Sequence, residues 1–326
     1  MERVMIITKT PFRISFFGGG TDISNYYETG YGAVVSTSIN KYMYITVNKR
    51  FDDTIRVSYS KTEIVNHVDE LQHELVRECL KMVGITKGIE ITSISDIPAG
   101  TGLASSSCFT VGLLNALYTY VGERLSAHEL AEKACQIEID ILKHPIGKQD
   151  QYAAACGGLN YFRFNQDGTV SQSKIVMNDS EFKKMDRKLM MFYTGISRSA
   201  DAILSDQKQR TVNKLDVLNA MRQQAEDMKV ILGAEGFTET FADKLDEAWQ
   251  MKRSISNKIS NSEINDAYER AIKAGARGGK LLGAGGGGFL LVYCDEEKQD
   301  AVKEAIGLKE LDFRISHYGS RVVYFA

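Results

Sequence analysis

The chain has 326 residues, of which 43% are hydrophobic, and its formal net charge at pH 7 is -2. This length is enough for one large domain or two modest ones with buried cores. The nearly balanced charge excludes a general electrostatic attraction to nucleic acid or to an acidic membrane surface, so any anion-binding site must be local.

The first half of the chain is predicted to mix strands with helices. Apolar and β-branched runs predict strands at 4–8, 42–48, 55–59, 89–94 and 159–164. Helices are predicted at 69–83, 108–121 and 127–142, and Ser126 with Glu129 forms a capping box that opens the last one. Pro145 and Gly147 then break that helix and let the chain turn back.

The second half of the chain follows a polar stretch at 165–174. It is predicted to contain a strand at 188–194, amphipathic helices within 199–232, 238–255 and 262–274, a strand at 288–294, a short helix, and a final strand at 321–325. This succession predicts an α+β protein. We place the boundary between two domains in the region 165–187, which gives domains 1–175 and 176–326.

The five cysteines form no CxxC pair and no Cys/His cluster of the kind that binds zinc. The first residues contain too short an apolar run for a signal peptide, and no apolar stretch approaches the ~18 residues of a membrane span. We therefore expect a reduced, cytoplasmic protein without structural zinc and without a membrane partner.

The stretch 98-PAGTGLASSS-107 stands directly before a predicted helix. Glycines expose backbone N–H groups there, serines add hydroxyl donors, and the start of a helix carries unpaired N–H groups and the positive end of the dipole. This combination predicts an anion site, most simply for phosphate. For each serine, the alternative interpretation is an ordinary N-cap.

A second glycine-rich stretch, 283-GAGGGG-288, formally matches GxGxxG. A dinucleotide site requires a strand before that motif and a helix after it, whereas here a helix precedes and a strand follows. The Walker motif GxxxxGK[ST] is absent. The glycine run indicates a close approach of backbone, either to another loop or to a ligand.

Together with 10-TPFRISFFGGGTD-22, these stretches resemble the three signature motifs of the GHMP kinases, which include galactokinase, homoserine kinase and mevalonate kinase. Within the family, 18-GGGTD-22 and 147-GKQDQYAAACGG-158 are most similar to D-glycero-D-manno-heptose 7-phosphate kinases. The resemblance implies a two-domain GHMP fold, with an N-terminal ribosomal-S5-like domain and a C-terminal ferredoxin-like domain. It also implies ATP and Mg²⁺ as cofactors.

The resemblance assigns the nucleotide and metal sites. Ser106 and Glu138 match the family's magnesium ligands, although Glu138 alone would be interpreted as a solvated helix residue. Ala104 stands where the family usually has glycine, a change that we expect to be tolerated. The glycines of the third motif form a supporting loop at Gly283, Gly285, Gly286 and Gly287. The residues expected around the phosphates are Pro98, Gly100, Thr101, Gly102, Leu103, Ala104, Ser105, Ser106 and Ser107.

The resemblance also assigns catalysis to Asp150 and Arg13. Asp150 would take or orient the proton of the acceptor hydroxyl, two roles that the sequence does not separate, and Arg13 would hold Asp150 ionised and favour the developing charge. Taken alone, Arg13 could be a surface arginine on a strand and Asp150 a helix N-cap.

The implied substrate is a small sugar phosphate, bound by Gly19, Gly20, Asp22 and Asp150, in an enzyme that is a monomer or a homodimer. Galactokinases carry Gly-Glu-His-Thr-Asp where this chain has 18-GGGTD-22, so two side chains that would contact galactose are missing. Arg198 is the candidate cation for the 7-phosphate, and Lys9 is a weaker one.

The expected reaction is phosphorylation of the anomeric hydroxyl of the heptose 7-phosphate, giving the 1,7-bisphosphate. A fucose or galactose 1-kinase is the second possible class, and a catalytically inactive sugar sensor is the third. Arg13, Glu138 and Asp150 argue against a sensor, which has no use for groups that transfer phosphate.

Overall fold

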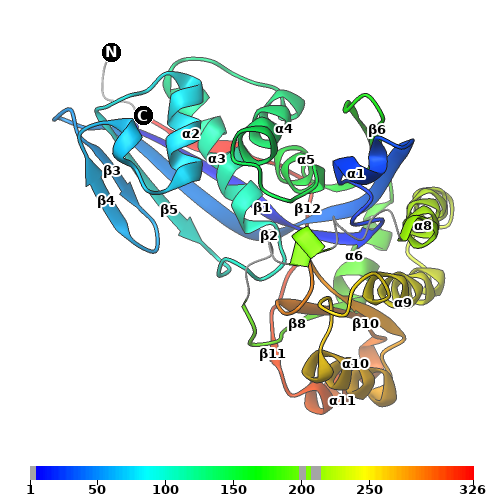
Figure 1. Cartoon of the computed structure of the whole chain (residues 1–326). Helices are drawn as coiled ribbons and strands as arrows, with labels where there is room; N and C mark the ends of the chain where they lie inside the picture. Colours follow the sequence, from blue (N-terminus) through cyan, green and yellow to red (C-terminus); the bar gives the residue numbers. More distant parts are fainter. Residues whose placement is uncertain (1–4, 198–202, 207–213) are drawn as a thin grey trace.

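The computed structural model describes residues 5–197, 203–206 and 214–326, which form two β-sheets with helices packed on them (Figure 1). In this part of the chain the larger sheet has nine strands, and its main path runs β13-β1-β2-β5-β3-β4. Its members are β1 (Met5–Phe17), β2 (Tyr31–Lys49), β3 (Ile55–Ser58), β4 (Thr62–Val65), β5 (Ile89–Ser95), β6 (Leu159–Asn165), β7 (Val170–Lys174), β12 (Ile315–Ser316) and β13 (Arg321–Phe325).

The smaller sheet has four strands in the order β11-β8-β10-β9. They are β8 (Leu189–Tyr193), β9 (Gly278–Leu281), β10 (Phe289–Tyr293) and β11 (Lys309–Glu310). The strand pairs β8–β10, β9–β10 and β8–β11 of this sheet are antiparallel. The predicted α+β class is therefore confirmed.

Four helices pack on one face of the larger sheet (Figure 1). They are α2 (Glu74–Val83), α3 (Ser105–Tyr120), α4 (Ala127–Cys135) and α5 (Gln149–Cys156). Helix α3 lies against β1 and β2 and is buried along most of its length. The Ser126–Glu129 capping box is present at the start of α4. The predicted helix 127–142 is shorter in its α-helical part, because residues Gln136–Ile141 form one π-helical segment, η2.

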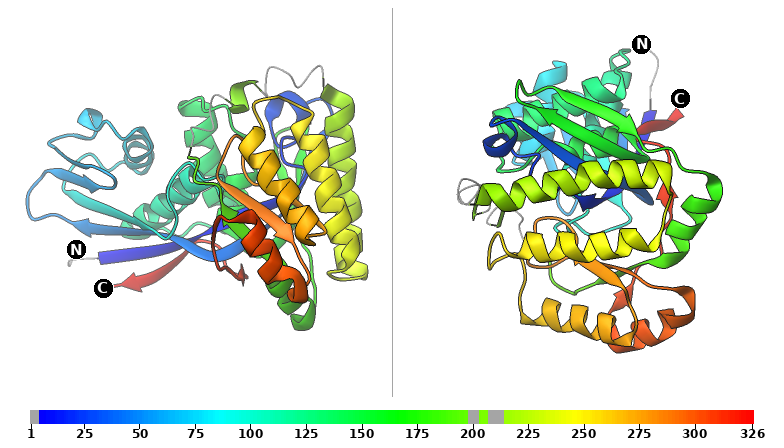
Figure 2. Two further views of the ribbon diagram at one scale, coloured as in Figure 1. Left: turned by 90° about the horizontal axis from the view of Figure 1, so that it is seen from below. Right: turned by 90° about the vertical axis from the view of Figure 1, so that its right-hand side faces the viewer.

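Most of the remaining helices lie around the smaller sheet or join it to the larger one: α6 (Asp179–Lys188), α8 (Leu215–Ala234), α9 (Glu239–Arg253), α10 (Ser262–Ala274), α11 (Gln299–Ile306) and the short η4 (Glu296–Lys298). The short α1 (Ser24–Tyr27) contacts β2, and the short η1 (Val68–Glu70) contacts α2. Helix α8 packs on β2 and α9, and α9 packs on β9 (Figure 2). The rings of Phe16 and Phe17 at the end of β1 meet Phe241 of α9 edge to face.

Strands β1 and β2 are much longer than predicted. They pair from Met5↔Asn48 to Phe17↔Val35, with two register shifts. Their inner parts are buried on both faces, so the alternation of polar and apolar residues that identifies a half-exposed strand is missing there.

The end of the chain returns to the larger sheet, where β13 pairs with β1 and lies beside the start of that strand (Figure 2). The division at residue 175 remains a prediction, and this last strand lies beyond it in sequence. The five cysteines are free thiols. None of the helices in the described ranges is long and apolar enough to cross a bilayer.

Candidate active site

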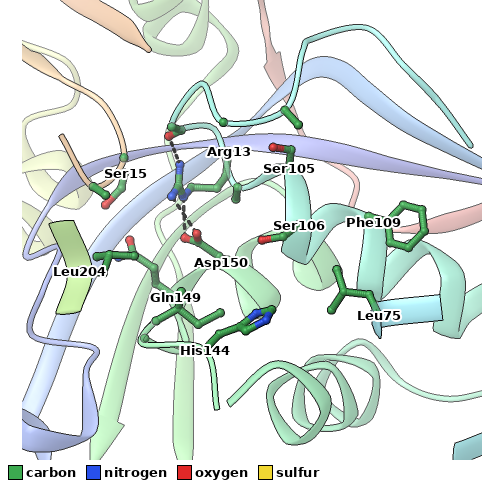
Figure 3. A pocket seen from close by; sticks show the side chains of 18 of the residues that line it. Arg13, Ser15, Leu75, Ser105, Ser106, Phe109, His144, Gln149, Asp150 and Leu204 are labelled. Atoms are coloured by element: carbon green, nitrogen blue, oxygen red, sulfur yellow. Dashed lines mark hydrogen bonds and ion pairs between the residues drawn. The ribbon is translucent and has the colours of Figure 1, made fainter. Parts of the chain in front are cut away.

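A cavity of about 630 Å³ lies where residues 98–104 before α3 (the phosphate-like loop), the start of α3, the end of β1 and the start of α5 meet the glycine-rich loop between β9 and β10. Figure 3 shows Arg13 and Asp150 next to each other, with Ser105 and Ser106 at the start of α3 and with Leu75 and Phe109 farther along the cavity. The three motifs that the sequence analysis singled out therefore share one site.

The loop before α3 presents its backbone to this cavity. Gly100 and Gly102 have positive φ, and so does Ala104, whose φ of 69° is a conformation that a Cβ atom disfavours. Gly100, Gly102, Ala104, Ser105 and Ser106 line the cavity. The other predicted members serve the loop itself: Thr101 donates a hydrogen bond to the Pro98 carbonyl, and Leu103 is buried in the core.

The glycine-rich loop at residues 283–288 lies directly on the phosphate-like loop. A Cβ atom added to Gly283 would be 2.3 Å from the Gly102 Cα atom, so neither loop has room for a side chain there. Gly283, Gly285 and Gly287 line the cavity, whereas Gly286 donates its N–H to the Ile259 carbonyl. This geometry supports the expected role of the run as a supporting loop.

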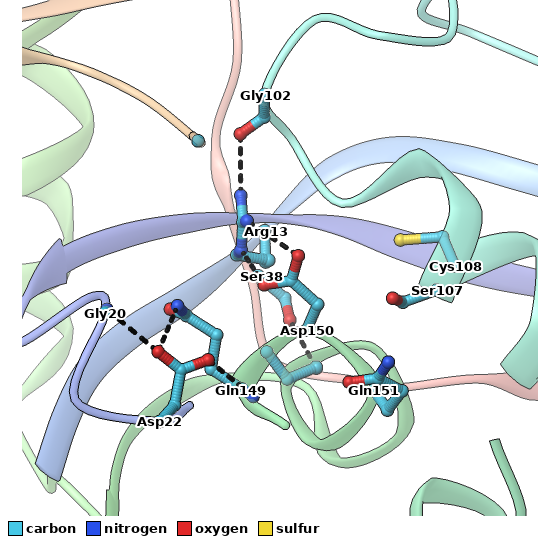
Figure 4. Close-up of polar contacts among 12 residues, drawn as sticks. Arg13, Gly20, Asp22, Ser38, Gly102, Ser107, Cys108, Gln149, Asp150 and Gln151 are labelled. Carbon is cyan, nitrogen blue, oxygen red and sulfur yellow. Dashed lines mark hydrogen bonds and ion pairs between the residues drawn. The ribbon is translucent and has the colours of Figure 1, made fainter. Parts of the chain in front are cut away.

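Arg13 and Asp150 form a two-point ion pair (Figure 4). Arg13 Nε donates to Asp150 Oδ1 at 2.8 Å, and Nη2 donates to Oδ2 at 2.9 Å. Arg13 Nη1 donates to the Gly102 carbonyl at 2.8 Å, which ties the pair to the phosphate-like loop. Arg13 is only 4% exposed, so it is not a surface arginine. Parallel hydrogen bonds of this kind fix the orientation of the carboxylate as well as its position.

Asp22 lies beside this pair and is buried. Its Oδ1 accepts hydrogen bonds from the Gly20 N–H and from Gln149 Nε2, and its Oδ2 accepts one from the Gln149 N–H. Burial, followed by the charge of Asp150, raises the pKa of Asp22. A Cβ atom on Gly147 would be 2.0 Å from Asp22 Oδ2, which explains the glycine at that position. Gly19 and Gly20 line the same part of the cavity.

Glu138 is fully buried behind α3 and does not line the cavity. Its Oε2 accepts hydrogen bonds from Ser107 Oγ at 2.9 Å and from Gln151 Nε2 at 2.5 Å. Burial raises the pKa of Glu138 to about 7, against the effect of these two hydrogen bonds. The Ser107 hydroxyl is thus committed to Glu138, and the structure gives its predicted phosphate contact no support.

The far end of the cavity is aromatic. The His73 ring stacks on Phe109 with centroids 5.0 Å apart, and Tyr59 meets His73 edge to face. Leu75 and Met43 complete this end. Burial lowers the pKa of His73, so its imidazole is mainly neutral at pH 7. Sequence reasoning missed this aromatic end, because its residues come from separate elements and share no motif.

Sequence reasoning also missed Lys252, in the last turn of α9. Lys252 lines the cavity, is 7% exposed, and donates a hydrogen bond to the Gly283 carbonyl. Burial, reinforced by the Arg13 guanidinium, lowers its pKa to about 8, against the opposing effects of Asp22 and Asp150. Helix α9 has ordinary amphipathic spacing, and nothing in its sequence sets this lysine apart.

The structure bears differently on the two residues predicted to bind a sugar phosphate, Lys9 and Arg198. Lys9 is wrong as a candidate, because its ammonium lies over the Tyr42 ring, 3.7 Å from the centroid, and it does not line the cavity. Arg198 lies outside the described residues. The last described residue before it, Ser197, donates a hydrogen bond to the Ala99 carbonyl of the phosphate-like loop.

Comparison with protein families matches residues 66–158 to the GHMP kinases N terminal domain and residues 231–310 to the GHMP kinases C terminal domain. The chain is 30% identical over 311 residues to D-glycero-alpha-D-manno-heptose 7-phosphate kinase of Campylobacter jejuni. This match covers 90% of the chain and 91% of the relative. It is 26% identical to the galactokinase of Pyrococcus furiosus, with 92% of each chain covered.

Among solved structures, the chain is similar to a D-glycero-D-manno-heptose 1-phosphate kinase from Bacteriodes thetaiotaomicron. The TM-score is 0.81 at 25% identity, and the match covers 98% of this chain and 99% of the other. The two-domain GHMP kinase fold expected from the motifs is confirmed by these matches. The chain belongs to the GHMP kinase family and is an ATP-dependent sugar kinase.

Proposed function

We propose that this kinase transfers the γ-phosphoryl group of ATP to the anomeric hydroxyl of D-glycero-D-manno-heptose 7-phosphate and produces the 1,7-bisphosphate. The observation that carries the proposal is the Arg13–Asp150 ion pair, held in one cavity with Asp22 on one side and the N-terminus of α3 on the other. A carboxylate so placed can receive or orient a hydroxyl proton while the helix N-terminus holds phosphate.

The nucleotide would lie along the cavity. Its phosphates fit the backbone of residues 99–106, where the loop N–H groups and the helix dipole favour negative charge. Its base fits the aromatic end, where His73 and Phe109 offer ring faces in an apolar setting. Phosphoryl transfer needs positioning and charge stabilisation more than covalent chemistry, and this arrangement supplies both.

Magnesium is implied by the family, and the residues present fit it. Glu138 Oε1 is a buried oxygen without a hydrogen-bond partner in the described part of the chain, and such an atom suits a cation. Ser106, at the start of α3, lines the cavity, and Glu138 lies behind the same helix start, where it accepts a hydrogen bond from the neighbouring Ser107. Glu138 and Ser106 would hold the metal together with phosphate oxygens of the nucleotide, which is the usual mixed coordination of Mg²⁺. When bound, Mg²⁺ neutralises charge on the phosphates.

Asp150 and Arg13 would act on the acceptor. Asp150 accepts the hydrogen bond of the anomeric hydroxyl, and the adjacent Arg13 guanidinium favours negative charge as it develops during transfer. Asp22 is held by three hydrogen bonds in a fixed position, so it can accept a hydrogen bond from another sugar hydroxyl. The intact Arg13–Asp150 pair favours an enzyme over an inactive sugar sensor.

The identity of the sugar as a heptose 7-phosphate is the most specific part of the proposal. Two relatives whose names specify a heptose phosphate kinase support it, and glycines at 18–20 leave the acceptor end without the side chains by which galactokinases contact a hexose. We propose Arg198 as the cation for the 7-phosphate. A galactose or fucose 1-kinase is the alternative, which similarity to a galactokinase keeps open.

An ADP-release assay over a panel of acceptors tests the proposal. The panel contains galactose, fucose, mannose, a free heptose, and the 1- and 7-phosphates of the heptose. We expect the highest kcat/KM with the heptose 7-phosphate, and a product in which nuclear magnetic resonance shows a new phosphate on the anomeric carbon. A higher kcat/KM with a free hexose or deoxyhexose would contradict the heptose assignment and favour the alternative.

A further inference from the structure

Two cations line the cavity, Arg13 from β1 and Lys252 from α9. Arg13 is anchored on the carbonyl of Gly102, and Lys252 is anchored on the carbonyl of Gly283. These two glycines are in direct backbone contact, so the two anchors lie next to each other at the junction of the loops. Arg13 and Lys252 are also the Arg and Lys side chains that line the cavity in the described part of the chain.

The two cations differ in their carboxylate partners. Arg13 has both oxygens of Asp150, whereas Lys252 forms no ion pair among the residues that the structure describes. The oxygens of nearby Asp22 are already engaged by Gly20 and Gln149. An ammonium group has three N–H donors, of which the Gly283 carbonyl takes one. A buried charge without a counter-ion is costly, and an anion in the cavity would remove that cost.

We propose that Lys252 contacts the γ-phosphoryl group of the nucleotide and stabilises its charge during transfer. The proposal depends on the kinase activity of the chain and not on which sugar accepts the phosphate. In the transfer, the acceptor oxygen forms a bond to Pγ while the bond from Pγ to the β–γ bridging oxygen breaks. The electron pair of that bond stays on ADP, and the hydroxyl proton goes to Asp150 or to water that Asp150 holds. Lys252 keeps its proton throughout.

The position of Lys252 favours the transferred group over the 7-phosphate of the acceptor. Its anchor, Gly283, touches the loop on which the nucleotide phosphates would lie, and its charge interacts with Asp150, where the anomeric oxygen would be. A phosphate on C7 is at the opposite end of the sugar from that oxygen. Lys252 therefore lies where nucleotide and acceptor meet.

Measurements of nucleotide binding in the absence of sugar distinguish a contact of Lys252 with the γ-phosphoryl group from a role in holding the loop or in binding the sugar. We compare the affinities for magnesium complexes of ADP and of AMPPNP, a nonhydrolysable ATP analogue, in the parent protein and in Lys252→Met. A charge-assisted hydrogen bond to the γ-phosphoryl group predicts a loss of about ten- to a hundredfold for AMPPNP and less than threefold for ADP. With an accepted sugar, kcat should fall about a hundredfold or more, and Lys252→Arg should restore part of it.

Lys280→Met is the matched control for removing a buried lysine. Lys280 is 2% exposed, donates to the Phe16 carbonyl at 2.6 Å and does not line the cavity. Its loss can lower thermal stability, but at pH 7, where Lys252 is protonated with or without the charge of Lys280, it should leave the ratio of AMPPNP to ADP affinity unchanged. Equal losses of ADP and AMPPNP affinity in Lys252→Met would overturn the proposal in favour of a loop-holding role. A rise confined to the KM of the acceptor would overturn it in favour of a sugar contact.

The parent protein gives an independent measurement if Lys252→Met does not fold. The charged groups that face Lys252 are Arg13 on β1, Asp22 in the loop after β1, Asp150 on α5 and Lys280 on β9. Burial lowers the pKa of Lys252 to about 8. The affinity for AMPPNP should therefore fall relative to that for ADP as the pH rises from 7.5 to 9.5. A constant ratio over this range would contradict the proposal.

Discussion

Asp150→Asn is the substitution that tests the proposed catalytic centre most directly. It keeps the shape of the side chain, removes its charge, and replaces one accepting oxygen with an NH₂ group. In the parent, Arg13 donates to both Asp150 oxygens. In the variant the NH₂ group faces an N–H donor, so one of the two hydrogen bonds is lost and the Arg13 charge loses its counter-ion.

The cost in stability follows from burial. Removing one partner of a buried ion pair costs about 3–5 kcal/mol. Asp150 is 24% exposed, and Arg13 keeps its hydrogen bond to Gly102, so we expect the lower end of that range, about 3 kcal/mol. Turnover should fall about a thousandfold, because a positioned proton acceptor contributes about 10²–10⁴ in rate. Affinity for the nucleotide should change little.

Urea unfolding measures the stability, ADP release measures the turnover, and a binding titration measures the affinity for the nucleotide. Asp140→Asn is the matched control, since Asp140 is an exposed carboxylate on η2, and it should leave all three unchanged. Turnover of Asp150→Asn within tenfold of the parent would refute the assignment of Asp150.

The remaining predictions concern the metal, the loop contact and the acceptor. Ser106→Ala and Glu138→Gln should each raise the Mg²⁺ concentration required for half-maximal activity, and an unchanged magnesium titration would remove that residue from the metal site. Gly283→Ala should lower the unfolding free energy by about 2–4 kcal/mol, because φ is +74° and the new Cβ would overlap Gly102, whereas Gly30→Ala, with open space around it, should not. Arg198→Met should raise the KM for the heptose 7-phosphate but not for ATP, with a smaller effect on an unphosphorylated heptose; equal effects on both sugars would exclude a phosphate contact.

The sequence was sufficient for the parts of the site that depend on local chemistry. The loop before α3 and the helix after it were predicted from the glycines and serines of residues 98–107, whose binding of phosphate stays a prediction, and the break at Pro145 and Gly147 was predicted from their backbone restrictions. The contact between Arg13 and Asp150 was expected through the family resemblance, and the geometry shows it. The family usually has glycine where this chain has Ala104. The structure shows why, because Ala104 adopts the left-handed conformation that glycine would adopt without strain.

Other parts depend on tertiary contacts that no local pattern records. Helix α6 was missed because its sequence is strongly polar and only Met185 is buried, although Asn178 caps it through the Glu181 N–H. The inner half of β1 was missed because burial on both faces removes alternation. In the sequence Lys252 resembles any other lysine near a helix C-terminus. Only its tertiary contact with the Gly283 carbonyl in the loop at residues 283–288 sets it apart.

The contact between Gly102 and Gly283 accounts for the interdependence of motifs that are far apart in sequence. Each glycine has positive φ and leaves no space for a side chain on the other, so the two loops meet through backbone alone. Such contact also directs the two carbonyls toward cations, Arg13 on one side and Lys252 on the other. The two acceptors are backbone oxygens, whose positions are fixed by the contact between the loops. The loops therefore help to fix the positions of the Arg13 guanidinium and the Lys252 ammonium. The proposed position of the nucleotide phosphates in this cavity therefore depends on the glycines of both motifs at once.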